Sequence, residues 1–184
     1  LEDNDINSNP NKFNECVKLV QLRLKKNDMR VLYPDIGFCV SLEMLDLSNN
    51  KLISLPSEIG LLTALVELKL NYNELDTIPP EFGSCQNLRV LEMRHNLIRG
   101  GVPETVGLMA SLQVLDVSFN SINHIPRSVV GLKQITKILA FSNLISTVPD
   151  TILSLKSLST LDFGRNKFSR FPVELCVMKN YQLI

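Results

Sequence analysis

Hydrophobic residues recur along the chain with a single period. The segment that begins at Leu42 reads LEMLDLSNNKLISLPSEIGLLTA, and the segment that begins at Leu65 reads LVELKLNYNELDTIPPEFGSCQN. The same phase continues in steps of 23 residues, with one step of 24. A period of this length indicates a solenoid, in which each unit buries its apolar face against its neighbours. The units begin at Leu19, Leu42, Leu65, Leu88, Leu112, Ile135, Leu158 and Tyr181.

The repeats fill the chain, so we expect one domain over residues 1–184. Residues 1–18 match the back part of a repeat, and residues 181–184 match the start of another. Neither end carries a polar cap, and bare ends of a solenoid expose core leucines. We therefore expect this segment to belong to a longer protein. The full repeats are 19–41, 42–64, 65–87, 88–111, 112–134, 135–157 and 158–180.

Each repeat follows the pattern L-x-x-L-x-L-x-x-N-x-L-x-x-L-P-x-x-I-G-x-L-x-x. The L-x-L core predicts a short strand with alternate side chains inside, and stacked strands form a parallel sheet on the concave face. The proline fixes φ and ends the strand, so the segment after it predicts a short helix or 3₁₀ turn on the convex face. The fold class is therefore an α/β, right-handed repeat solenoid.

An asparagine occupies the ninth position of every full repeat. We expect its side-chain amide to satisfy unpaired backbone groups of its own turn and of the neighbouring turn, each of which would otherwise cost about 1–3 kcal/mol. This predicted structural ladder consists of Asn27, Asn50, Asn73, Asn96, Asn120, Asn143 and Asn166.

The pattern resembles the leucine-rich-repeat family over essentially the whole chain. The L-P-x-x-I-G-x-L back half is similar to the 23-residue intracellular class of Ras-group scaffolds and Roco-type GTPase proteins. One repeat departs, because Asn96–Pro103 carries an extra residue and resembles the N-x-L-x-G-x-I-P form of plant extracellular receptors. The resemblance implies protein binding on the concave sheet face, with a small GTPase, phosphatase or kinase as partner.

Aromatic side chains next to the asparagine column mark a candidate binding surface in the middle of the chain. Aromatic residues and arginine are enriched where protein interfaces concentrate their binding energy. The alternative is that the rings pack against each other as a side wall of the solenoid. The predicted partner-binding residues are Lys69, Tyr72, Glu92, Arg94, His95, Val114, Asp116, Phe119, Leu139 and Phe141.

The outward column inside L-x-L alternates in charge through Arg23, Asp46, Lys69 and Glu92. Because neighbouring strands lie about 4.8 Å apart, these residues could form a cross-strand charge ladder. Exposed pairs contribute only about 0–1 kcal/mol each, so such a ladder would mainly keep the sheet face soluble.

Charge balance excludes some classes of partner. The chain has 19 Lys and Arg against 19 Asp and Glu, without the basic excess of a nucleic-acid-binding protein. No apolar run approaches the roughly 18 residues of a membrane-spanning helix. We therefore expect neither nucleic-acid binding nor membrane insertion.

Candidate catalytic chemistry is sparse. The two histidines, His95 and His124, have no nucleophile and orienting partner at a recognisable spacing, and we expect His124 in a turn. No metal-ligand spacing occurs, so we expect no metal, no cofactor and no enzymatic activity. Cys16 and Cys39 occupy one column on adjacent coils, where an oxidised pair is one option and buried thiols replacing leucine are the other. The remaining cysteines are Cys85 and Cys176.

Three hypotheses for the function remain open. The unclustered cysteines and the lack of an Asn-x-Ser/Thr site favour a reducing, cytoplasmic compartment, and with it an intracellular scaffold or signalling adaptor. The second is the recognition arm of a larger signalling enzyme, such as a Roco-type GTPase, kinase, phosphatase or cyclase. The third is a receptor ectodomain.

Overall fold

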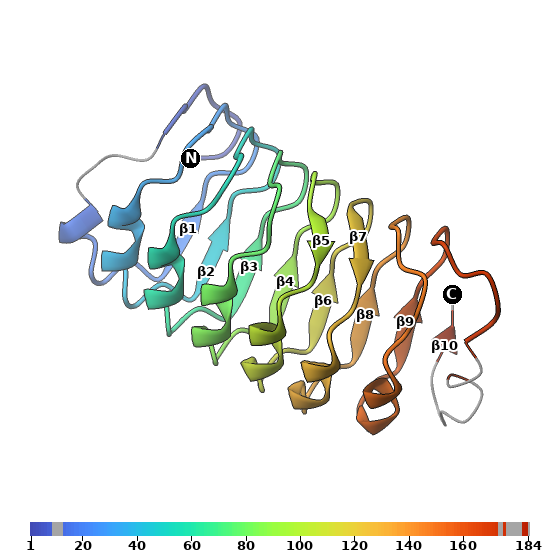
Figure 1. Cartoon of the computed structure of the whole chain (residues 1–184). Helices are drawn as coiled ribbons and strands as arrows, with labels where there is room; N and C mark the ends of the chain where they lie inside the picture. Colours follow the sequence, from blue (N-terminus) through green and yellow to red (C-terminus); the bar gives the residue numbers. More distant parts are fainter. Residues whose placement is uncertain (9–12, 173–174, 176–181, 184) are drawn as a thin grey trace.

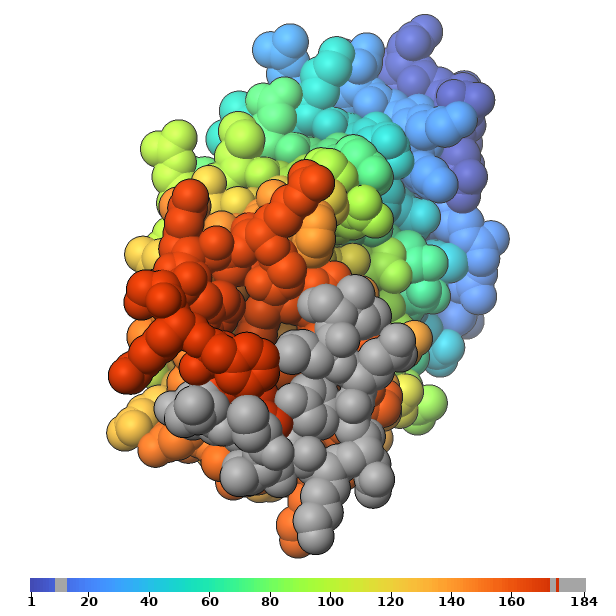
Figure 2. Space-filling model, turned by 90° about the vertical axis from the view of Figure 1, so that its right-hand side faces the viewer, coloured from blue at the N-terminus to red at the C-terminus, as the bar shows by residue number. Residues whose placement is uncertain are grey.

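A computed structural model describes residues 1–8, 13–172, 175 and 182–183 of the chain. The described chain forms stacked coils, with strands on one face and 3₁₀ helices on the other (Figure 1). Viewed from the C-terminal end, the coils recede one behind another in chain order (Figure 2). The predicted α/β repeat solenoid is confirmed, and short 3₁₀ helices form the face opposite the sheet.

Among the described residues, the main sheet contains eight parallel strands that follow the chain order. The middle residue of each three-residue strand of this sheet faces the core, because alternate residues of a strand point to opposite sides. The 23-residue step places these residues opposite one another, as Leu45 stands opposite Leu68. The strands are β1 (Gln21–Arg23), β2 (Met44–Asp46), β3 (Glu67–Lys69), β4 (Val90–Glu92), β6 (Val114–Asp116), β8 (Lys137–Leu139), β9 (Thr160–Asp162) and β10 (Gln182–Leu183).

The register changes at the last strand. Continuation of the 23-residue step from Leu158 to Tyr181 predicts Ile184 opposite Leu161. In the structure Leu183 stands opposite Leu161 instead. The step from Leu161 to Leu183 is 22 residues, one fewer than the 23-residue period.

The face opposite the sheet consists of 3₁₀ helices that begin after the proline column. Pro56, for example, has an extended backbone with φ −70° and ψ 152°, which ends the preceding segment before the helix η3 (Ser57–Leu61). The third residue of that helix, Ile59, is fully buried and joins the core. The helices are η1 (Phe13–Glu15), η2 (Pro34–Phe38), η3 (Ser57–Leu61), η4 (Pro80–Ser84), η5 (Glu104–Leu108), η6 (Arg127–Gly131) and η7 (Asp150–Ser154).

A second, two-stranded sheet forms at the repeat with the extra residue. Strand β5 (Arg99–Gly101) pairs in parallel with β7 (Ser121–His124). Gly100 has φ +74°, a backbone conformation that residues other than glycine rarely adopt. We expected His124 in a turn, and this expectation was wrong. The longer loop after Asn96 brings residues 99–101 alongside residues 121–124, so that His124 belongs to a strand.

Each asparagine of the ladder connects its own coil to the preceding one. The Nδ2 of Asn50 donates to the Leu47 carbonyl at 3.0 Å and to the Leu24 carbonyl of the preceding coil at 2.9 Å. Its Oδ1 accepts a hydrogen bond from the Met29 backbone N–H at 3.0 Å. The same three contacts recur at the other six asparagines. One side chain therefore satisfies donors and acceptors in two successive turns.

Candidate functional site

Five of the predicted binding residues lie on strands of the main sheet and face away from the core. Lys69 is on β3, Glu92 on β4, Val114 and Asp116 on β6, and Leu139 on β8. All five are partly exposed, whereas the middle residue of each of these strands is buried. We call this surface the sheet face.

Three aromatic residues occupy the turns that follow the strands, in an unusual backbone conformation. Tyr72, His95 and Phe119 have φ values of 57°, 54° and 55°. The left-handed region costs an L-residue about 1–2 kcal/mol, so the surrounding turn must hold it. The backbone N–H of His95 donates to the Ser118 carbonyl at 3.0 Å, and the following Asn96 is bonded on both sides. The repeat therefore fixes the direction in which each ring leaves the backbone.

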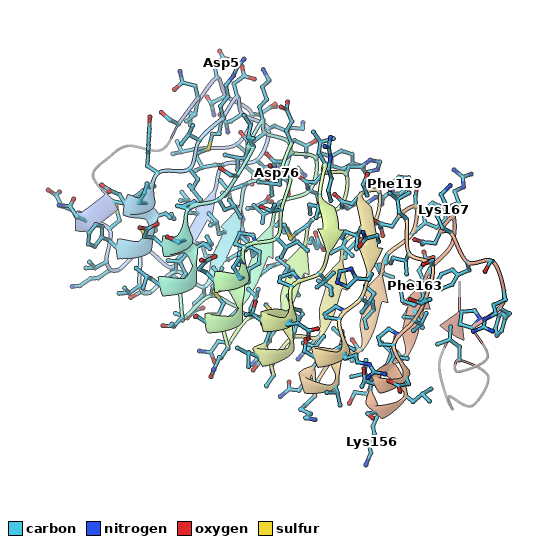
Figure 3. The ribbon with its side chains drawn as sticks, viewed as in Figure 1. Asp5, Asp76, Phe119, Lys156, Phe163 and Lys167 are labelled. Carbon is cyan, nitrogen blue, oxygen red and sulfur yellow. The ribbon has the colours of Figure 1, made fainter. Side chains whose placement is uncertain are left out.

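The rings form one continuous stack, which we call the aromatic strip: Tyr72, His95, Phe119 and Phe141. The ring centroids lie 4.5 Å apart for Tyr72 and His95 and 4.1 Å apart for His95 and Phe119, both with an interplanar angle of 13°. Phe119 and Phe141 are 5.3 Å apart and tilted by 51°. The rings thus pack on one another, and Tyr72 keeps 46% of its surface exposed. In Figure 3 Phe119 lies towards the edge of the solenoid that also carries Asp76 and Lys167, whereas Lys156 lies at the opposite edge.

Arg94 lies beside the strip with its guanidinium over an aromatic ring. Its Cζ is 4.9 Å from the Phe119 ring centroid, a distance at which a cation is attracted to the ring. Its backbone N–H donates to Asn71 Oδ1 at 2.8 Å. Its Nε is buried and has no hydrogen-bond partner among the described residues. Arg94 is therefore held at the strip by the ring and by its backbone.

A pocket of about 290 Å³ opens on the sheet face beside the strip. Its position follows from residue size along one column. The Phe141 ring lies over Gly164, where an added Cβ would come within 2.8 Å of Phe141 Cδ2, and the small Ser118 lies on the other side of Phe141. We call this space the sheet-face pocket. It is lined by Arg94, Asp116, Ser118, Phe119, Leu139, Phe141 and Asp162.

Two carboxylates at the pocket each use one oxygen to hold a turn. Asp116 Oδ1 accepts a hydrogen bond from the Ser118 backbone N–H at 2.9 Å, and Asp162 Oδ1 accepts one from the Gly164 backbone N–H at 2.9 Å. In the part of the chain that the structure describes, neither carboxylate forms an ion pair. Their second oxygens remain available at the pocket.

The pocket brings together half of the predicted binding residues: Arg94, Asp116, Phe119, Leu139 and Phe141. Tyr72 and His95 continue the aromatic strip away from it, and Lys69, Glu92 and Val114 lie on strands beside it without lining it. The sequence prediction missed Ser118 and Asp162. Both belong to outward columns that the repeat defines, and Asp162 stands next to Leu139 on the following coil, beyond the predicted limit at Phe141.

The expected cross-strand charge ladder takes a different form. Lys69 Nζ lies 2.8 Å from Oε1 of Glu67, which is on the same strand. Glu92 Oε2 accepts a hydrogen bond from Asn71 Nδ2 at 2.8 Å. The Asp46 carboxylate binds the backbone N–H of Ser48. The hydrogen bond to Glu67 raises the pKa of Lys69, with burial opposing it and Glu67, Glu92 and Asp46 adding to it through their charges.

The surroundings of His95 favour its neutral form. Burial lowers its pKa, the nearby Arg94 charge lowers it further, and Asp116 acts in the opposite direction. A neutral imidazole stacks between Tyr72 and Phe119 without bringing charge into the strip. Among the described residues, no group of three or more His, Cys, Asp or Glu could hold a metal ion. Over the same residues, no helix is long and apolar enough to cross a membrane.

The cysteines are free thiols where the structure describes them. Cys39 and Cys85 are buried and Cys16 is partly buried, and the optional Cys16–Cys39 pair is not formed. Burial raises the pKa of both Cys39 and Cys85 to about 11, with Cys16 adding to the effect at Cys39. Thiols this hard to ionise are poor nucleophiles at neutral pH. Cys176 lies outside the described residues.

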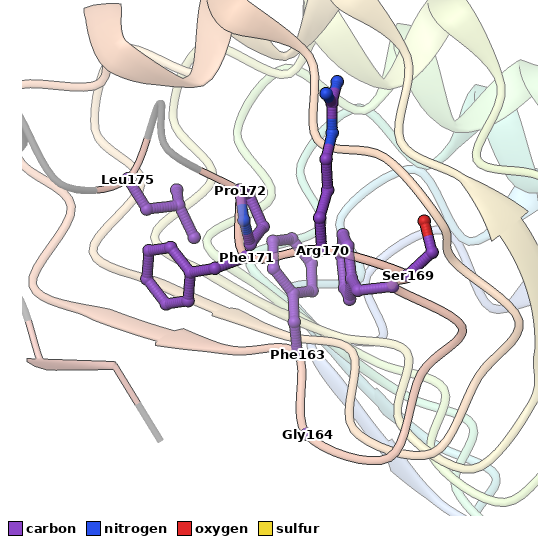
Figure 4. Close-up of a pocket in the computed structure, with 8 residues that line it drawn as sticks. Phe163, Gly164, Ser169, Arg170, Phe171, Pro172 and Leu175 are labelled. Carbon is purple, nitrogen blue, oxygen red and sulfur yellow. The ribbon is translucent and has the colours of Figure 1, made fainter.

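A second pocket, of about 460 Å³, lies near the C-terminal end of the described chain (Figure 4). Its lining is mainly apolar, and Phe163 and Phe171 are grouped there with Pro172 and Leu175. The Arg170 side chain extends away from this group in Figure 4. Residues 173–174 and 176–181 lie outside the described part of the chain.

Comparison with protein families gives a clear match. A family model described as Leucine rich repeat matches residues 40–98 and again residues 87–145, which together cover more than half of the chain. Comparison with curated protein sequences gives no match.

Solved structures share the fold. The ectodomain of the plant membrane receptor kinase GASSHO1/SCHENGEN3 from Arabidopsis thaliana, solved with CASPARIAN STRIP INTEGRITY FACTOR 2, is 30% identical with a TM-score of 0.88, over 98% of this chain and 22% of that one. Internalin C2 from Listeria monocytogenes is 23% identical with a TM-score of 0.81, over 98% and 77%. A repeat protein from Leptospira interrogans is 24% identical with a TM-score of 0.73, over 99% and 53%. This chain thus spans about half of the Leptospira protein and under a quarter of the plant ectodomain.

Proposed function

Because the chain belongs to the leucine-rich-repeat family, we propose that it is a non-catalytic module that binds a protein partner on its sheet face. The observation that carries this proposal is the sheet-face pocket, which opens directly beside the aromatic strip. Together they form a surface that spans five successive coils, from Tyr72 to Asp162. Family members generally act through protein interaction, and this surface is the part of the chain whose residue types support that role best.

The surface is preorganised for binding. Positive φ values fix the rings of Tyr72, His95 and Phe119, and stacking restricts their rotation. A partner therefore loses little binding free energy to the ordering of these side chains. Aromatic rings and an arginine, held rigid around a pocket, are typical of the residues that dominate interface affinity.

An intracellular scaffold or signalling adaptor is our first choice of role, with a small GTPase, phosphatase or kinase as partner. The back half of most repeats supports it, because it is similar to the intracellular class. The buried thiols of Cys39 and Cys85 are compatible with a reducing, cytoplasmic compartment. The same surface would serve equally as the recognition arm of a larger signalling enzyme.

A receptor ectodomain is the second candidate. The observation in its favour is the 30% identity to the plant receptor ectodomain, together with the extra sheet of β5 and β7 at the repeat that resembles plant extracellular receptors. In that case the sheet face would bind an extended peptide.

Site-specific photo-crosslinking tests the proposed role. A benzophenone amino acid at Val114 on the sheet face, and in a separate variant at Leu108 on the opposite face, would be activated in cytosolic and extracellular fractions of the source cells. We expect a discrete protein adduct from position 114 that weakens with Phe119→Ala or Arg94→Ala. Equal adducts from both positions, or no effect of either substitution, would contradict binding on the sheet face. The fraction that yields the adduct separates the scaffold from the ectodomain.

A further inference from the structure

The sheet-face pocket has an apolar floor between two carboxylates. Strand pairing places Leu139 directly between Asp116 and Asp162, one on each neighbouring strand. Each carboxylate keeps one oxygen that no backbone group of its own turn uses. An apolar residue flanked by two acceptors suits a ligand group with an apolar stem and several donors at its tip.

The charges in the pocket are not matched within the chain. Arg94 is the cation of the lining, but its guanidinium lies over the Phe119 ring. A second arginine, Arg165, lies over the Phe141 ring at 5.5 Å. Among the described residues no Lys or Arg forms an ion pair with Asp116 or Asp162. The floor of the pocket therefore has a surplus of negative charge that an incoming cation would neutralise.

The size and spacing of the pocket favour one side chain. A volume of about 290 Å³ lies at the lower end of the roughly 300–1,000 Å³ of pockets that enclose a whole small molecule. Two strand spacings, about 10 Å, separate the backbones that carry Asp116 and Asp162. A planar guanidinium has donors on opposite edges and can reach towards both carboxylates, whereas an ammonium group is a point charge.

We propose, on the basis of the protein-binding role above, that the sheet-face pocket receives an arginine side chain from an extended segment of the partner. The stem of this arginine packs on Leu139 and Phe141. Its guanidinium donates to the free oxygens of Asp116 and Asp162. Arg94 stays over the Phe119 ring at the other side of the pocket and forms no ion pair with either carboxylate.

Nuclear magnetic resonance with short peptides provides the test. The ¹⁵N-labelled chain is titrated with the capped tripeptide acetyl-Leu-Arg-Leu-amide and with matched peptides that carry Lys, Gln or Glu in the middle. The backbone amides of Ser118 and Gly164 report on the site, because they donate to the two carboxylates. We expect the Arg peptide to shift both amides and to bind about tenfold more tightly than the Gln peptide, as for loss of a charge-assisted hydrogen bond.

Substitution of Asp by Asn keeps the size of the side chain and removes its charge. Such variants distinguish binding in the pocket from a general effect of protein charge on peptide binding. In Asp116→Asn and Asp162→Asn the remaining amide oxygen can still accept the turn hydrogen bond, so the fold is preserved. Asp46→Asn is the matched control, because Asp46 holds Ser48 by the same 2.9 Å hydrogen bond but lies outside the pocket. We expect both pocket variants to lose the preference for Arg over Gln, and the control to keep it.

Several results would overturn the inference. They are equal shifts from the Arg and Gln peptides, tightest binding of the Glu peptide, or an Arg preference that survives Asp116→Asn combined with Asp162→Asn. If these occur and position 114 still crosslinks a partner, the protein-binding role stands and the arginine pocket is wrong. If the Arg preference is found but crosslinking is equal on both faces, the pocket is supported and the partner-binding role fails.

Discussion

The imidazole ring of His95 lies almost parallel to the ring of Phe119, with centroids 4.1 Å apart and an interplanar angle of 13°. Both residues precede a ladder asparagine and both have a left-handed backbone, so the contact follows from the repeat itself. Stacked turns place equivalent residues about one strand spacing apart, which is close to the stacking distance of two rings. Aromatic residues at this position of consecutive repeats therefore stack without any adjustment of the fold.

The stack predicts how His95 titrates. Its lowered pKa means that the native state binds a proton less readily than the unfolded chain, whose histidines titrate near 6.5. His95 thus stabilises the fold above about pH 6.5, and this contribution is lost as the pH falls through the folded pKa. We expect a midpoint below 6.5 when the His95 Cε1–H resonance is followed by NMR.

Two substitutions next to His95 should move this midpoint in opposite directions. Arg94→Gln removes the neighbouring positive charge and should raise the pKa of His95, whereas Asp116→Asn removes a negative charge and should lower it further. A midpoint that moves the same way in both variants would contradict the assigned electrostatic causes.

The asparagine ladder predicts a local cost for each amide that is removed. Asn96→Ala leaves the Leu75 N–H without its acceptor. It also removes one of the two side-chain amide donors at each of the Leu70 and Met93 carbonyls, and we expect a loss of about 1–3 kcal/mol in unfolding free energy. Urea denaturation followed by circular dichroism measures it. Asn87→Ala is the control, because Asn87 also donates to a backbone carbonyl but is exposed to water. Equal losses in the two variants would show that burial of the turn does not matter.

The inner leucines should carry a larger share of the stability. Leu115 is 1% exposed on β6, so Leu115→Ala creates a cavity and should cost about 2–5 kcal/mol. The control Leu108→Ala removes the same atoms from a side chain that is 60% exposed on the opposite face, and it should cost far less. Thermal unfolding of both variants checks the difference. A similar melting temperature for the two would be inconsistent with the observed register.

The buried cysteines should resist alkylation in the native protein. A pKa of about 11 keeps the thiols of Cys39 and Cys85 protonated at pH 8, and burial blocks the reagent. Iodoacetamide followed by mass spectrometry should label Cys16 before either of them, and all three should react in urea. Because the pKa values are raised in the fold, the protonated thiols favour the native state below about pH 9, and this advantage declines as the pH rises towards 11. Rapid native labelling of Cys85 would rule out its burial.

The sequence alone predicts the repeat, the parallel sheet, the short turns and the location of the core, because each depends on which side chain recurs at which step. Leu45 and Leu68 must face each other if the coils stack, and they do. The periodic pattern contains less information where a repeat changes length. The pairing of β5 with β7 depends on one inserted residue and on Gly100, and the register of β10 depends on one residue fewer.

The surface was harder to predict than the core. The columns of equivalent repeat positions show which residues share a face, but they do not predict the direction in which each side chain points. Phe141 leans over Gly164 because the neighbouring position has no side chain, and this opens the sheet-face pocket. The same is true of Lys69, whose partner is Glu67 on its own strand instead of a charge on the adjacent coil. Choices of rotamer such as these depend on several neighbours at once.

Because every ladder asparagine completes the turn of the coil before its own, no coil is a self-sufficient unit. The gene can therefore lengthen or shorten only in particular ways. Duplication or deletion of one whole period keeps each asparagine amide opposite its backbone partners. Most insertions or deletions of another length between Asn73 and Asn96 would move the Asn96 amide away from these partners. The single extra residue before Pro103 shows where surplus length is absorbed, in the loop between the asparagine and the proline. Evolution of a new binding surface in this protein is thus expected to proceed by exchanging outward side chains and by copying complete coils.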